Sequence, residues 1–175
     1  MAIRILLVAL AMTLFARGAY AQETADCTKQ ITSWSVCDAS NPPPRECWAV
    51  TIPEKTVNTK DGRVVAVRRS QILLMVAFRP GEEDQGQIAF TGGYPFKGGS
   101  SVSLTIDGTT FQLITDGEWA WPASGGDDAK IVAAMKRGSQ AVAVAMSSRG
   151  TRTEDSFSLA GFTAAFDEAE KRCKA

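Results

Sequence analysis

Four cysteines limit what this 175-residue chain can fold into more than any other feature. They are Cys27, Cys37, Cys47 and Cys173, and the chain contains no histidine that could share a metal ion with them. Zinc sites built from cysteine use close pairs such as C-x2-C, and no two of these cysteines have that spacing. An even number of well-separated cysteines in an exported protein is typical of a disulfide framework. The sequence therefore predicts two disulfides.

The N-terminal segment predicts export. Arg4 precedes the apolar run 5–15, and Ala19 and Ala21 supply the small residues that signal peptidase recognises. The run has 11 residues, whereas a membrane-spanning helix needs roughly 20. We therefore expect residues 1–21 to be a cleaved secretion signal. Residues 22–175 should then form a single disulfide-bonded β domain, periplasmic or secreted, without a membrane span.

Three pairings of the four cysteines exist, and the turn chemistry favours one of them. Cys37 and Cys47 enclose the segment DASNPPPRE, whose three prolines favour a stiff reversal between adjacent strands. We therefore expect a Cys37–Cys47 disulfide. This leaves Cys27 to pair with Cys173 and to join the two ends of the domain.

Most of the chain has the pattern of β-strands. Residues 101–106 alternate apolar and polar side chains, Asp107-Gly108 is a two-residue hairpin signal, and residues 109–115 return. The continuous apolar run 72–78 is typical of a strand that is covered on both faces. Further strands are expected near 34–37, 47–52, 87–90, 141–147 and 153–159, after an extended leader at 22–32.

Two segments have the pattern of short helices, at about 127–137 and 162–171. Asp127 is the expected N-cap of the first helix, and Gly138 follows its end. In the second, apolar residues recur at helical spacing from Phe162, and Cys173 falls on the same face. Many short strands with two helices predict a mainly β fold, an antiparallel β-sandwich or partly closed barrel.

The charge balance argues against nucleic acid as a partner. Loss of residues 1–21 would remove two arginines and no acid, which leaves 17 Lys and Arg against 19 Asp and Glu. Nucleic-acid-binding domains are usually strongly basic on one face. The nearest approach to a basic patch is interpreted as solvated strand ends around a turn; its members are Lys60, Arg63, Arg68 and Arg69.

The sequence carries no recognisable catalytic motif. Without histidine there is no Ser-His or Cys-His nucleophile pair, and the glycine-rich stretch 91–100 lacks the Walker order. We expect no catalytic residue, cofactor or metal ion. Composition leaves one enzyme class, a glycosidase with paired carboxylates, for which Asp107, Asp116 and Glu118 are the candidates. Asp107 and Asp116 each precede a glycine, which turn chemistry explains better.

Trp119 and Trp121 form the candidate binding surface. They share one face if their segment is extended, where two indoles could stack on a sugar ring or on an apolar side chain of a partner. The alternative is that they cover one end of the core. Large aromatic side chains are mostly buried, which favours this second interpretation.

Several short motifs resemble those of the invasion-associated locus B family. They are W-x-V-C at 34–37 with a second cysteine ten positions on, L-x-I-D-G at 104–108 and F-S-L-x-G-F-x-x-A at 157–165. The resemblance extends from about Trp34 to Phe166 and implies an exported, β-rich protein of a Gram-negative bacterium. Many members carry a second close cysteine pair near the position of residues 116–123, where this chain has Trp119 and Trp121 instead.

The resemblance implies no agreed biochemical activity, since family members take their label from an association with host-cell invasion. We expect a non-enzymatic exported protein that binds a protein or a component of the cell envelope. The alternative is a carbohydrate-binding or glycan-active protein that uses Trp119, Trp121 and the nearby carboxylates.

Overall fold

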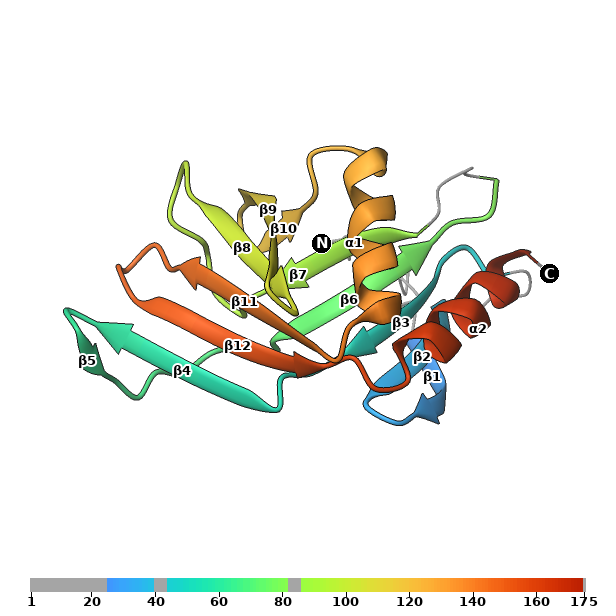
Figure 1. Cartoon of the computed structure of the whole chain (residues 1–175), viewed down its shortest axis with the longest axis horizontal. Coiled ribbons are helices and arrows are strands. Elements are labelled where there is room, and N and C mark those ends of the chain that lie inside the picture. The colour runs from blue at the N-terminus through green and yellow to red at the C-terminus, as the bar shows by residue number, and fades with distance from the viewer. Residues whose placement is uncertain (1–24, 40–43, 82–85, 175) are drawn as a thin grey trace, which may run out of the picture.

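The computed structural model describes residues 25–39, 44–81 and 86–174. Within these residues every strand belongs to one twelve-stranded antiparallel sheet, with the order β1-β2-β3-β6-β7-β10-β9-β8-β11-β12-β4-β5 (Figure 1). The strands are β1 (Ala25–Ile31), β2 (Trp34–Ala39), β3 (Cys47–Thr51), β4 (Lys55–Lys60), β5 (Arg63–Val64), β6 (Leu73–Phe78), β7 (Gln87–Thr91), β8 (Ser101–Ile106), β9 (Thr109–Asp116), β10 (Trp119–Trp121), β11 (Gln140–Met146) and β12 (Arg152–Ser158). The mainly β, antiparallel fold predicted from the sequence is confirmed.

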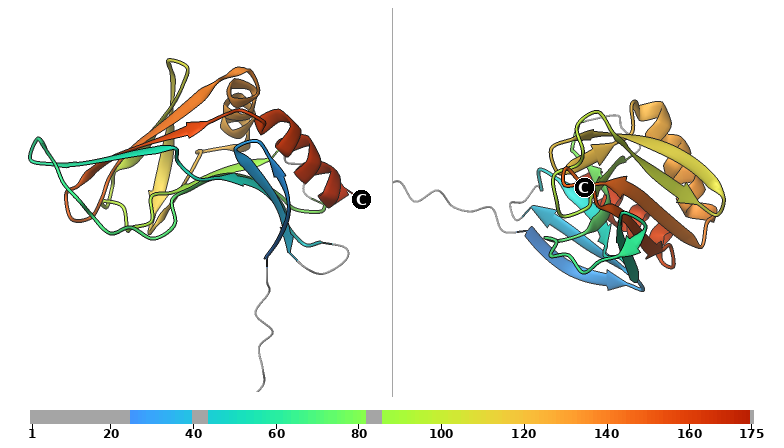
Figure 2. Two further views of the ribbon diagram at one scale, coloured as in Figure 1. Left: turned by 90° about the horizontal axis from the view of Figure 1, so that it is seen from below. Right: turned by 90° about the vertical axis from the view of Figure 1, so that its left-hand side faces the viewer.

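The sheet curls, so that its two wings share one core (Figures 1 and 2). Phe90 of β7 and Phe157 of β12 meet edge to face, with ring centroids 6.2 Å apart. Both rings are fully buried. The sheet does not close into a barrel, because β1 and β5 remain as its two edges.

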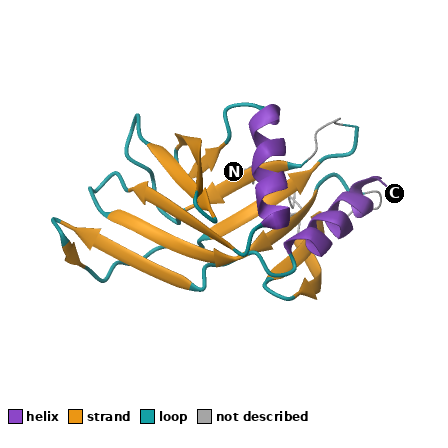
Figure 3. Ribbon diagram, viewed as in Figure 1, coloured by secondary structure: helices purple, strands orange, loops and turns teal. Residues whose placement is uncertain are grey.

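Two helices pack on the inner face of the sheet (Figure 3). Helix α1 (Gly125–Arg137) is capped by Ser124, whose hydroxyl accepts a hydrogen bond from the Asp127 amide. The predicted N-cap, Asp127, is therefore wrong by three residues. Helix α2 (Phe162–Lys174) packs against β2, β3 and β6, with Phe162 against Trp34 and Phe166 against Phe78.

The observed disulfides are Cys27–Cys37 and Cys47–Cys173, so the predicted pairs Cys37–Cys47 and Cys27–Cys173 are wrong. In the β2–β3 ladder Cys47 lies opposite Asp38. Cross-strand partners point to the same face and successive residues to opposite faces. Cys37 therefore points away from Cys47, which lies on the inner face beneath α2, where Cys173 meets it.

Strand β1 explains the partner of Cys37. Residues 25–31 are not the expected extended leader but an edge strand that pairs with β2. A register shift between Asp26 and Lys29 places Cys27 beside Cys37, with their Cα atoms 3.9 Å apart. The expected secretion signal, residues 1–21, lies outside the described residues.

Candidate functional site

Apolar side chains occupy much of the outer face of the sheet, opposite the helices. On β6, Leu74 and Val76 are fully buried inside, while Leu73 and Met75 alternate with them and point outward. The prediction that residues 72–78 are covered on both faces is therefore only half right. The outward side chains of Leu73 and Met75 are half-buried, and that of Ala77 is buried, by neighbouring strands alone, since α1 and α2 both pack on the inner face.

Trp119 and Trp121 belong to this outer face. Between them on β10, Ala120 points inward and is fully buried. The two indoles are nearly parallel, at 21°, with ring centroids 6.4 Å apart. Both are half-buried. The expectation that they cover one end of the core is therefore wrong, and their common face, expected if the segment is extended, is confirmed.

The strand register joins the indoles to other apolar side chains. Val50 lies opposite Met75 and Met75 opposite Ala89, while Trp121 lies opposite Ile114. In the next row on the same face, two residues along each strand, Leu73 lies opposite Thr91 and Thr91 opposite Trp119. We call this surface the aromatic face; its members are Val50, Leu73, Met75, Ala89, Thr91, Ile114, Trp119 and Trp121.

Small residues at the centre let larger ones meet over them. Ala89 and Thr91 of β7 point outward and yet are nearly buried, because the larger side chains of β6 and β10 flank them. At the margin Ile114 is 59% exposed. A contiguous exposed apolar surface on a small protein often marks an interaction site. Alternating apolar residues in several strands are the sequence signal for such a face, but they look like core residues until the strand order is known.

The three candidate carboxylates do not form one site. Asp107 lies in the turn before the eight-residue strand β9, and Asp116 is the last residue of that strand. The strand separates them by about 25–30 Å at 3.3 Å per residue, whereas a glycosidase needs its two carboxyls about 5–9 Å apart. Asp107 accepts hydrogen bonds from the Ser139 amide, the Ser139 hydroxyl and the Gln140 amide. These hydrogen bonds lower the pKa of Asp107, and the bond from the Ser139 amide has the largest effect. Asp107 therefore joins a hairpin turn to the loop after α1.

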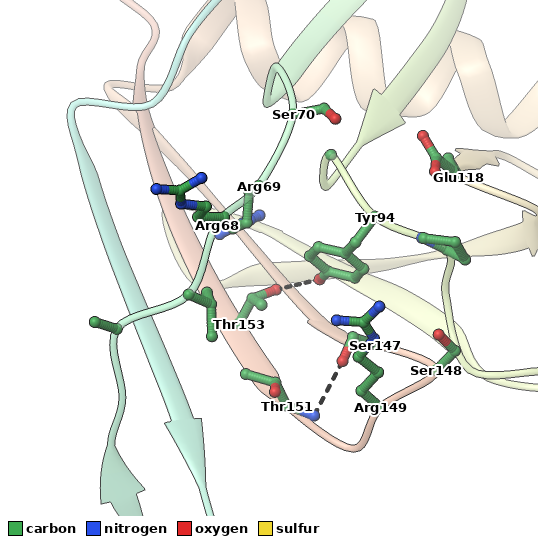
Figure 4. A pocket seen from close by; sticks show the side chains of 14 residues that line it. Arg68, Arg69, Ser70, Tyr94, Glu118, Ser147, Ser148, Arg149, Thr151 and Thr153 are labelled. Atoms are coloured by element: carbon green, nitrogen blue, oxygen red, sulfur yellow. Dashed lines mark hydrogen bonds between the residues drawn. The ribbon is translucent and has the colours of Figure 1, made fainter.

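A cleft opens at the end of the sheet away from α2 (Figure 4). Its volume is about 660 Å³, within the size range of small-molecule sites. Four segments form its walls: the crossing from β5 to β6, the loop after β7, the β9–β10 turn and the β11–β12 turn. The lining residues are Ala66, Val67, Arg68, Arg69, Ser70, Gly93, Tyr94, Pro95, Glu118, Ser147, Ser148, Arg149, Thr151 and Thr153.

A buried ion pair holds one wall of the cleft. Arg69 donates two hydrogen bonds to the Asp155 carboxylate, at 2.8 and 2.6 Å, and both side chains are almost fully buried. Arg69 also donates to the Gly92 carbonyl and to the Asn58 side chain. The prediction that Arg69 belongs to a solvated basic cluster is therefore wrong. Arg69 is a buried structural cation that joins β12, β4 and the loop after β7.

Tyr94 lies beside this ion pair. The Arg69 guanidinium stands over the Tyr94 ring, 5.0 Å from its centroid, and the phenol shares a short hydrogen bond with the Thr153 hydroxyl. Burial raises the pKa of the Tyr94 phenol. The tyrosine is thus a fixed neutral group on the cleft wall.

Three charged groups of the cleft remain unpaired. In the described part of the chain, Arg68, Arg149 and Glu118 have no ion-pair partner. Figure 4 shows the Arg149 guanidinium directed toward Tyr94, while Glu118 lies on the opposite side of the cleft. Both residues are exposed.

The described residues contain no group of three or more His, Cys, Asp or Glu side chains placed to hold a metal ion. Among the same residues, neither helix combines the length and the apolar character needed to cross a membrane.

Comparison with known proteins assigns the chain to a family. No curated protein matches it. A solved structure that it resembles is the invasion associated protein B of Bartonella henselae, with a TM-score of 0.51 and 16% sequence identity over 81% of this chain and 94% of that chain. At this identity the likeness concerns the fold. The family model for the invasion associated locus B (IalB) protein matches residues 34–170. The chain therefore belongs to the invasion associated locus B family.

Proposed function

We propose that this chain is an exported, non-enzymatic protein that binds another protein through the aromatic face. The observation that carries the proposal is the continuous apolar surface of β3, β6, β7, β10 and β9, which lies opposite the two helices. The curled sheet holds this surface rigidly, so that little ordering is needed when a partner binds.

The cysteines support export. All four are joined in disulfides, and such bonds persist in the periplasm or outside the cell but are rare in the cytoplasm. With the predicted secretion signal at residues 1–21, they favour a periplasmic or secreted location for residues 22–175.

The chemistry of the aromatic face favours a protein as the partner. Its members are apolar or uncharged, with the exposed Asp116 at the margin opposite Trp119, and Trp and Met are enriched in the buried centres of protein interfaces. An anionic membrane surface or a nucleic acid would need clustered Lys and Arg, and the aromatic face contains neither. The similar Bartonella henselae protein is named for invasion. This name supports a partner in the cell envelope or on a host cell.

Photocrosslinking in the native cell tests the proposal. A benzophenone amino acid replaces Ile114, an exposed member of the aromatic face, or Val64 on edge strand β5, which is 78% exposed. We expect one discrete crosslinked protein from position 114 and none from position 64. Adding Trp121→Ser to the chain with the probe at 114 should remove that product, because Trp121 lies directly opposite.

Equal crosslinking from positions 114 and 64, or a product that survives Trp121→Ser together with Trp119→Ser, would show that the aromatic face does not select the partner. Glycan binding by the purified protein that is lost in Trp119→Ala and Trp121→Ala variants would favour the carbohydrate-binding alternative instead.

A further inference from the structure

The cleft has the composition of a binding site, independent of the aromatic face. Arg149 and Glu118 face it from opposite sides and, among the described residues, neither has an ion-pair partner. Hydroxyl groups also line the cleft: within the described part, those of Ser70, Ser148 and Thr151 have no hydrogen-bond partner. Arg68, which also lines the cleft, is likewise without an ion-pair partner in the described residues. The cleft therefore offers two unpaired arginines, one carboxylate and several neutral donors and acceptors to a ligand.

Hydrogen bonds hold the walls of the cleft in place. Arg69 is held by Asp155, Asn58 and the Gly92 carbonyl, and it fixes the Tyr94 ring by stacking on it. The β11–β12 turn that carries Arg149 is tied by the Thr151 amide to the Ser147 hydroxyl and by the Ser148 amide to the Pro95 carbonyl. A ligand would therefore meet a Tyr94 wall and a turn backbone that are already in place, which reduces the entropy lost on binding.

We propose that this cleft binds an acidic sugar, with the sugar carboxylate on Arg149 and sugar hydroxyls on Glu118 and the serine and threonine side chains. A guanidinium recognises a carboxylate with two parallel hydrogen bonds. A carboxylate such as Glu118 accepts hydrogen bonds from hydroxyl groups, and a second anion beside it would be repelled. The volume of about 660 Å³ suits a mono- or disaccharide. The same chemistry occurs in a free uronic acid and at the end of an acidic polysaccharide.

Titration with matched sugars tests the proposal. Glucuronate and glucose differ in the carboxylate, and NMR spectra of the amide groups and arginine side chains report where each binds. We expect glucuronate to shift the signals of Arg149, Ser148 and Tyr94, and glucose to bind at least tenfold more weakly, because it cannot form the charge-assisted pair. A short oligomer of uronic acid, compared with the monomer, distinguishes a polysaccharide end from a free sugar.

Arg149→Gln removes the cation that the proposal assigns to the sugar carboxylate, leaves Arg68 in place, and should weaken glucuronate binding by tenfold or more. Arg152→Gln is the matched control, because Arg152 has the same charge three residues away but does not line the cleft. The NMR spectrum of each variant also reports whether it is folded. Absence of any shift at millimolar glucuronate, equal binding of glucose, or equal loss in both variants would overturn the proposal.

Discussion

At the scale of single residues, the Arg69–Asp155 ion pair is the group whose loss has the clearest consequence. Burial raises the pKa of Asp155, while the hydrogen bonds and charge of Arg69 act in the opposite direction. Removal of two charges from water offsets much of their attraction, so such a pair contributes little net stability while it is intact. Removal of one partner is different, because it leaves the other charge buried and alone.

We therefore expect Asp155→Asn to lower the free energy of unfolding by about 3–5 kcal/mol. Glu154→Gln is the control, because Glu154 pairs with Arg152 at the surface, where such pairs contribute about 0–1 kcal/mol. Urea denaturation measures both. The double variant Arg69→Met/Asp155→Leu should be more stable than Asp155→Asn, and a double variant that is less stable would contradict this view of the pair.

Asp107 gives a prediction that depends on pH. Its pKa is lower in the folded chain than in the unfolded chain because the Ser139 and Gln140 groups donate hydrogen bonds to it. A lowered pKa contributes stability that is present above the unfolded value of about 3.9 and is lost as the pH falls through the folded value. Asp107→Asn should therefore lower the urea concentration at the midpoint of unfolding at pH 7. The difference in midpoint from the wild type should shrink steadily below about pH 4. A difference that stays constant across that range would show that the charge of Asp107 has no part in it.

At the scale of elements, the two disulfides stabilise different parts of the sheet. Cys27–Cys37 joins neighbouring strands β1 and β2 and closes a short loop, with a sequence separation of 10. Cys47–Cys173 joins β3 to the end of α2 across a separation of 126. The loss of entropy that a disulfide imposes on the unfolded chain grows with loop length.

Replacing Cys47 and Cys173 by Ala should therefore lower the free energy of unfolding by up to about 5 kcal/mol, against up to about 3 kcal/mol for the Cys27 and Cys37 pair. Denaturation of the two double variants under oxidising conditions measures the difference. The reverse order would mean that β1 matters more to the fold than the terminal helix.

Local patterns predicted most elements but not their pairing. The hairpin around Asp107-Gly108 and the helix from Phe162 follow from turn chemistry and periodicity, which act within a few residues. The disulfides depend on register: one step between Asp38 and Cys37 decides which face a sulfur reaches. Local patterns in the sequence do not determine that register, because it depends on which strands pair in the folded sheet.

At the scale of the whole molecule, the arrangement of the sheet decides which apolar residues form the core. Leu74 and Met75 are neighbours in one apolar run, yet Leu74 is fully buried between the wings and Met75 lies on the aromatic face. The cleft likewise joins four segments that are far apart in the chain. Both surfaces depend on the strand order, which local patterns do not give, although the spacing of Trp119 and Trp121 predicts that they share a face.

Oxidative footprinting tests the central claim, that a protein covers the aromatic face, most directly. Hydroxyl radicals oxidise accessible Met and Trp side chains, and mass spectrometry locates the products. Met146 is the internal control, because it is also half-buried and points outward, but from β11 on the other wing. We predict that Met75, Trp119 and Trp121 are oxidised less, relative to Met146, in intact native cells than in the purified protein. Equal relative oxidation in the two samples would contradict the claim that a partner binds there.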